Sequence, residues 1–257
     1  MIFNNIHTLI IGRYFNAKDV GYYNQAKQYE QITSNTVTDI VMGVSFPTLV
    51  KYKNDIDGLK NAYKRIIEIV IFIVAPLMLG LMSFPCELFI CILTEKWLPA
   101  VPLFQILCIY GATFPLHQIN GNILKVLGKG KTLLYVEILR RILLIISILA
   151  TINISIEALL VGQIISMLFV IFVSMYCSGK LINYSVQEQL KDVSVYYLLA
   201  FIAVIISFVV KLCFNMSAIG TVIFMTLSIC VVYLIGCWML KVNAFVYLIN
   251  IIQEKVK

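Results

Sequence analysis

Long apolar runs recur along most of this sequence, and they constrain its fold more than any other feature. The run IIEIVIFIVAPLMLGLMSF can cross a bilayer as a helix, because a helix rises about 1.5 Å per residue and the hydrocarbon core is about 30 Å thick. Hydrophobic residues make up 61% and charged residues 13% of the 257 residues, and the mean hydropathy is +0.93. The sequence therefore predicts an all-α fold, a polytopic helix bundle in a membrane.

The polar turns between these runs predict about eight helices. We expect them at residues 2–13, 20–47, 61–84, 100–127, 131–152, 155–179, 193–213 and 217–240. The first is too short to span a bilayer and would be partial, and Pro47 falls near the expected end of the second. The segment PCELFICILTEKWLP indicates a short interfacial helix and a loop, and the tail after residue 240 indicates an amphipathic helix on the membrane surface.

Lysine and arginine concentrate in alternate connections between the predicted helices. The basic connections fall within residues 51–65, 125–131 and 180–191 and in the tail, whereas the others carry few cations. This bias predicts that the basic connections and the C-terminus are cytoplasmic. The net charge of +7 then reflects topology, and no basic soluble surface indicates a nucleic-acid partner.

Nothing in the sequence indicates an enzyme, a metal or a cofactor. No predicted loop much exceeds about 15 residues, which leaves no room for a soluble catalytic domain. His7 and His117 lack acids or cysteines at metal-ligand spacing, and the seven cysteines include no C-x-x-C pair. The turn GKGKT lacks the spacing of a phosphate-binding loop.

A polar stripe marks the second predicted helix. Its members recur at three- and four-residue steps and so share one face: Asn24, Gln28, Gln31, Asn35 and Asp39. An unsatisfied polar group in lipid costs several kcal/mol, so the stripe must face protein or water. It either bonds to neighbouring helices or lines a hydrated cavity. In the second case Gln31, Asn35 and Asp39 are candidate substrate-binding residues.

Two further polar groups lie within predicted membrane helices. Glu137 can pair with Arg140 or Arg141, and the arginines either extend toward the headgroups or face a cavity, where they would suit an anionic diphosphate. His117 follows Pro115 in the sequence HQINGN, which either compensates a kinked backbone or takes part in proton coupling. Arg140 and Arg141 are therefore candidate substrate ligands, and His117 and Glu137 are candidates for ion coupling.

Five segments together resemble the polysaccharide flippase family. LIIGRYFNAKDVGYYNQAKQYEQI resembles the family's pattern of an apolar helix end, Gly-Arg-aromatic, a short loop and Gly-Tyr-Tyr-Asn-x-Ala. VSFPTLVKYKND, APLMLGLM, EKWLPAVPLFQIL and GNILKVLGKGK are similar to later segments in the same order, although Val126 stands where a small residue is common. Over residues 6–180 the chain resembles the O-antigen (Wzx-like) branch of the multidrug/oligosaccharidyl-lipid/polysaccharide exporter superfamily.

The resemblance implies a two-lobe exporter in the bacterial inner membrane that flips undecaprenyl-diphosphate-linked oligosaccharide for lipopolysaccharide or other surface polysaccharides. Residues 1–180 would form the C-terminal six-helix lobe, and residues 181–257 two accessory helices and a cytoplasmic tail. The chain would then be a fragment that needs an N-terminal lobe or a partner chain. The alternatives are a drug or cation antiporter of the same superfamily, a membrane glycan polymerase or ligase, and a remnant that transports nothing.

Overall fold

The computed structural model describes residues 6–214 and 216–256, and every regular element in those ranges is a helix. The helices, with one 3-10 helix named η2, are α1 (Ile6–Tyr14), α2 (Ala17–Lys51), α3 (Ile56–Ser83), α4 (Pro85–Ile92), η2 (Glu95–Ala100), α5 (Val101–Val126), α6 (Gly130–Thr151), α7 (Ile156–Leu181), α8 (Val186–Leu212), α9 (Ala218–Met239) and α10 (Asn243–Val256). The predicted all-α bundle is confirmed.

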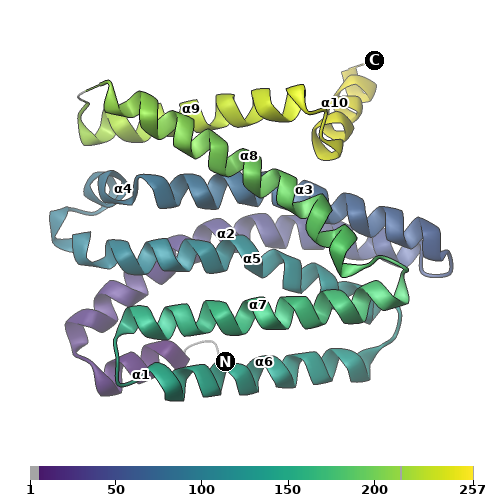
Figure 1. The fold of residues 1–257 in the computed structure, drawn as a ribbon, viewed down its shortest axis with the longest axis horizontal. Coiled ribbons are helices and arrows are strands. Elements are labelled where there is room, and N and C mark those ends of the chain that lie inside the picture. The colour runs from purple at the N-terminus through teal and green to yellow at the C-terminus, as the bar shows by residue number, and fades with distance from the viewer. Residues whose placement is uncertain (1–5, 215, 257) are drawn as a thin grey trace.

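The long helices lie roughly along one axis and alternate in direction (Figure 1). The connections after α2, α5 and α7 meet at one end of the bundle, and those after α1, α6 and α8 meet at the other. The basic connections of the sequence therefore gather at a single end, as an alternating membrane topology requires. Which side of the membrane that end faces stays a prediction.

Within the described part of the chain, five segments are long and apolar enough to cross a membrane: α3, the segment Glu95–Val126, α7, α8 and α9. The other helices predicted from the sequence are too short or too polar to be counted among these five segments. Helix α1 is described over 9 residues, while α2 and α6 carry polar and charged side chains through their middles. These two polar helices lie next to the cavity described below.

Three described helix boundaries differ from the prediction by four residues or more. Helix α3 begins at Ile56 rather than at residue 61, because the Asp55 side chain accepts a hydrogen bond from the Gly58 amide at 3.0 Å and caps the helix. Helix α2 does not end near Pro47 but continues to Lys51, because a proline within a helix removes one backbone hydrogen bond and can bend the helix without ending it. Helix α8 begins at Val186 rather than at residue 193, because Ser185 and Glu188 form a capping box. The Ser185 amide donates to Glu188 at 2.8 Å, and the Glu188 amide donates to Ser185 at 3.2 Å.

A buried polar cluster joins α3, α5 and α7. The Tyr63 hydroxyl donates to Asn120 Oδ1 at 2.6 Å, and the Ser178 hydroxyl donates to the same oxygen. The Asn120 amide donates to the Leu116 carbonyl at 2.7 Å, one turn away and beside Pro115. Asn120 therefore joins α5 to α3 and α7, and its bond to Leu116 stays within α5, whereas the carbonyl that loses its amide donor at Pro115 is that of Gly111.

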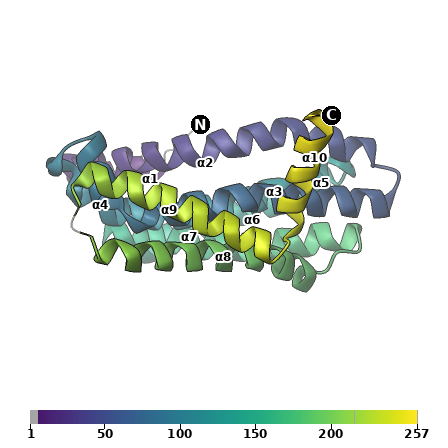
Figure 2. The same cartoon turned by 90° about the horizontal axis from the view of Figure 1, so that it is seen from above.

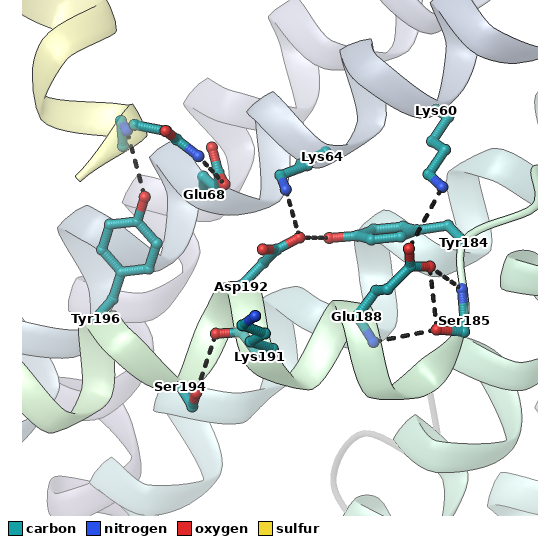
Figure 3. Close-up of polar contacts among 12 residues, drawn as sticks. Lys60, Lys64, Glu68, Tyr184, Ser185, Glu188, Lys191, Asp192, Ser194 and Tyr196 are labelled. Atoms are coloured by element: carbon teal, nitrogen blue, oxygen red, sulfur yellow. Dashed lines mark hydrogen bonds and ion pairs between the residues drawn. The ribbon is translucent and has the colours of Figure 1, made fainter. Parts of the chain in front are cut away.

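The two helices that follow α7 pack outward from this core. Helix α8 crosses α3 obliquely and packs against it, and α9 packs against α8 (Figures 1 and 2). At the end with the basic connections, Lys64 of α3 pairs with Asp192 of α8 at 2.8 Å, and the Tyr184 hydroxyl donates to the same carboxylate at 2.5 Å (Figure 3). Burial and the Asp192 carboxylate raise the pKa of Tyr184 well above its ordinary value, so this hydroxyl stays a donor.

Candidate functional site

A cavity of about 420 Å³ lies among α2, α5, α6 and α7, with α1 at its edge. Its walls combine a few apolar side chains with many polar and charged ones, which is unusual inside a membrane bundle. The polar lining residues are His7, Tyr23, Lys27, Glu30, Gln31, Ser34, Asn35, Tyr110, His117, Gln118, Glu137, Arg140, Arg141, Gln163 and Ser166.

The polar stripe of α2 runs along the open side of this cavity. All five of its side chains are exposed, and Gln31 and Asn35 line both the cavity and an adjoining, more open groove of about 650 Å³. Asp39 lines the groove and not the cavity. Asn24 accepts a hydrogen bond from Thr8 of α1 at 3.1 Å. Of the two interpretations left open by the sequence, this exposure favours a hydrated surface.

A second polar row on α2, which the sequence reading missed, faces α5. Its members Tyr23, Glu30 and Ser34 are buried, and Lys27 is partly buried. A methyl group at Gly111 of α5 would lie 2.3 Å from a Glu30 carboxylate oxygen, so the absence of a side chain there lets α5 pack against this acid. The three- and four-residue spacing of Lys27, Glu30 and Ser34 could have revealed the row.

Glu137 forms the centre of a charged cluster in the cavity wall. Its Oε1 lies 3.0 Å from His117 Nε2 of α5, and its Oε2 accepts from Arg140 Nε and Nη2 at 3.0 and 2.7 Å. One carboxylate therefore joins α5 to α6 and fixes the direction of the Arg140 guanidinium. Arg140 lies ten residues beyond Gly130 and so about 15 Å along α6, and Arg141 lines the same cavity.

Several buried polar atoms around the cavity have no hydrogen-bond partner within the described ranges. They are both ring nitrogens of His7, Nδ1 of His117 and Oε1 of Gln163. Buried polar atoms in folded proteins are normally satisfied by protein, water or a ligand. The cavity is thus equipped for water or a polar ligand. Among residues 6–214 and 216–256, no group of three or more His, Cys, Asp or Glu side chains could hold a metal ion.

The structure brings six of the seven residues singled out from the sequence to one cavity. Gln31 and Asn35 come from α2, His117 from α5, and Glu137, Arg140 and Arg141 from α6. Asp39 lies apart from the arginines on the adjoining groove. His7, Lys27, Glu30 and Gln163 line the cavity and were not expected there.

Comparison with known proteins supports the family resemblance. Residues 1–102 match the family model described as "Polysaccharide biosynthesis protein". The chain is 30% identical over 131 residues to the teichuronic acid biosynthesis protein TuaB of Bacillus subtilis, an alignment covering 51% of this chain and 27% of TuaB. It is 28% identical over 120 residues to the lipopolysaccharide biosynthesis protein WzxC of Escherichia coli, covering 47% of this chain and 24% of WzxC.

The fold is similar to that of the lipid II flippase MurJ in its inward closed conformation. The match has a TM-score of 0.73 at 15% identity, and it covers 93% of this chain and 51% of the MurJ chain. At that identity the likeness concerns the fold. The structural match thus covers about half of MurJ, and the sequence matches cover about a quarter of each of the curated relatives. The resemblance to polysaccharide flippases predicted from the motifs is confirmed.

Proposed function

We propose that this chain, which resembles polysaccharide flippases, is the cavity-bearing part of a transporter that flips undecaprenyl-diphosphate-linked oligosaccharide across the bacterial inner membrane, and that it is not an enzyme. One observation carries the proposal: a cavity within a membrane bundle is lined by amide side chains of α2 on one side and by two arginines of α6 on the other. Amides suit sugar hydroxyls, and guanidinium groups suit phosphate oxygens.

The charges of the cavity suit the headgroup of such a lipid. Arg140 and Arg141 would bind the diphosphate, and Gln31 and Asn35 would contact the first sugars, with Asp39 farther along the groove. A volume of about 420 Å³ accommodates a headgroup, while the prenyl chain stays in the surrounding lipid.

Glu137 and His117 remain our candidates for ion coupling. Glu137 already occupies two donors of Arg140, so a diphosphate that binds Arg140 competes with this carboxylate. A proton or cation that neutralised Glu137 would release the arginine for the substrate. The contact between Glu137 and His117 supports this link between the two proposed roles.

We also propose that a second helical lobe lies opposite the polar face of α2. The side chains of Gln28, Gln31, Asn35 and Asp39 are exposed along this face, and lipid contact there would cost several kcal/mol for each unsatisfied group. A second lobe, on the same polypeptide or on a partner chain, would enclose water between the two polar faces. Residues 1–180 would form the lobe described here, and residues 181–257 the accessory helices and tail.

The test replaces both arginines with glutamine in cells whose surface polysaccharide depends on the gene that carries this sequence. We expect Arg140→Gln/Arg141→Gln to lower the amount of exported polysaccharide at least about tenfold, because each lost charge-assisted contact is worth about 1.5–3 kcal/mol. Arg13→Gln, an exposed residue outside the cavity, is the matched control. Unchanged export by a membrane-inserted double variant would contradict the proposal.

A further inference from the structure

The chain turns sharply where α9 ends, at the end of the bundle that holds the basic connections. Helix α9 is long and apolar enough to cross the membrane and ends at Met239, and α10 then runs across the bundle instead of along it (Figures 1 and 2). Lys241 between them has a φ of 49°, a left-handed conformation that non-glycine residues adopt in tight turns. Helix α10 therefore lies at the level where the apolar part of α9 ends, along the membrane surface.

Specific contacts hold this corner in place. The side-chain amide of Asn243 donates to Glu68 Oε1 of α3 at 3.0 Å, and the Ala244 amide donates to the Tyr196 hydroxyl of α8 at 3.3 Å (Figure 3). The Arg65 guanidinium lies over the Tyr247 ring at 4.2 Å. The first turns of α10 are thus fixed to two membrane helices, so the corner is preformed.

A mainly apolar hollow lies between α10 and the end of α9. The hollow has a volume of about 410 Å³, and its lining residues are Trp238, Met239, Phe245, Val246 and Ile249, together with the polar Lys241 and Asn250. Trp238 is 66% and Met239 71% exposed, although both belong to a helix that spans the membrane. The angle between a spanning helix and a surface helix is a space that lipid chains can fill.

Lys241 places a positive charge beside this hollow. It is exposed, and it forms no ion pair with any residue whose side chain the structure describes. We propose that the corner between α9 and α10 binds one anionic phospholipid, with the phosphate at Lys241 and an acyl chain against Trp238, Val246 and Ile249. The charge of Lys241 and the apolar hollow beside it match the two parts of such a lipid. This inference does not depend on the proposed transport function.

The two tryptophans of the chain provide a direct test. In the Trp97→Phe variant, the fluorescence of Trp238 reports on the corner alone. We reconstitute the full chain in phosphatidylcholine nanodiscs that contain a small fraction of either acyl-brominated phosphatidylglycerol or acyl-brominated phosphatidylcholine. From the quenching of Trp238 fluorescence, the apparent affinity for the anionic lipid should be about five-fold higher than that for the neutral lipid. One lysine near the membrane surface raises the affinity for anionic lipid by about this factor.

A charge variant and two controls sharpen the test. Lys241→Asn removes the charge and keeps a residue that tolerates positive φ, so it should abolish the preference while leaving quenching by both lipids. Lys53→Asn, in an exposed turn away from the hollow, should keep the preference. In Trp238→Phe, the remaining Trp97 should show no dependence on Lys241.

Two results would overturn the proposal. Equal quenching of Trp238 by the two brominated lipids would mean that Trp238 and Lys241 are ordinary interfacial anchors without selectivity for a lipid charge. Quenching by neither lipid would mean that protein and not lipid covers the corner. Circular dichroism and gel filtration show whether each variant is folded, so that a folding defect is not mistaken for either result.

Discussion

Glu137 Oε1 lies 3.0 Å from His117 Nε2, so an acid of α6 and an imidazole of α5 meet in the wall of a polar cavity. The same carboxylate holds Arg140 through two hydrogen bonds. His117 is 4% exposed at its side chain, whereas Glu137 is 36% exposed. The carboxylate therefore reaches from a buried helix interface to the hydrated space, where it can respond to substrate or to a cation.

We expect Glu137→Gln to lower the melting temperature of the purified chain in detergent. Glutamine keeps the shape of the side chain but loses the charge that binds Arg140, and a hydrogen bond to a charged group contributes about 1.5–3 kcal/mol. Glu95→Gln, an exposed acid of η2 that does not line the cavity, is the control. A double-mutant cycle with Arg140→Gln should show coupling, and strictly additive losses would argue against the pair.

Tyr63→Phe should destabilise the chain by about 1 kcal/mol, the scale of interhelical hydrogen bonds in membrane proteins. The Tyr63 hydroxyl is buried and donates to Asn120, whose oxygen also accepts from Ser178, so its loss weakens a contact shared by three helices. Tyr176→Phe removes a hydroxyl from a ring that is 59% exposed and should have little effect. Equal melting temperatures of the two variants would contradict this prediction.

The helices were predictable from the sequence because apolar runs of membrane length leave few other folds. Three boundaries were not, because they depend on local chemistry that overrides the apolar pattern. Asp55 caps α3, which begins at Ile56 and not at residue 61. Ser185 and Glu188 form a capping box within a segment that hydropathy assigns to a loop. Pro47 was expected to end α2, but the helix continues past it to Lys51.

Some of the residues that line the cavity were predictable from the sequence, but the cavity as a whole was not. Periodicity showed that Gln31 and Asn35 share a face, and spacing showed that Glu137 can pair with Arg140. Whether these side chains meet in one cavity depends on how α2 is rotated about its axis against α5. Packing between residues that are distant in the sequence sets this rotation. The same rotation buries Glu30 beside Gly111, a relation that no local pattern contains.

Gly111→Ala should disturb the packing of α2 on α5. The added methyl group would lie 2.3 Å from Glu30 Oε1, and overpacking of this kind costs about 1–3 kcal/mol. Gly21→Ala is the matched control, because no atom lies within 4 Å of the position that its methyl group would take. Shortening the acid in Gly111→Ala/Glu30→Asp should recover part of the lost melting temperature. If Gly111→Ala were as stable as Gly21→Ala, α5 would not pack closely against the acid.

The orientation of the bundle can be tested with its own cysteines. Cys213 is exposed at the end of α8 opposite the basic connections, whereas Lys53 lies in the turn between α2 and α3. In spheroplasts, a membrane-impermeant maleimide should label a variant whose sole cysteine is Cys213. A Lys53→Cys variant without other cysteines should react only after permeabilisation.

Cys230 provides a control. It is exposed on the apolar helix α9 and should not react from either side, because a thiol surrounded by lipid does not form the reactive thiolate. The reverse pattern for Cys213 and Lys53→Cys would place the basic end outside and overturn the topology inferred from the positive charges.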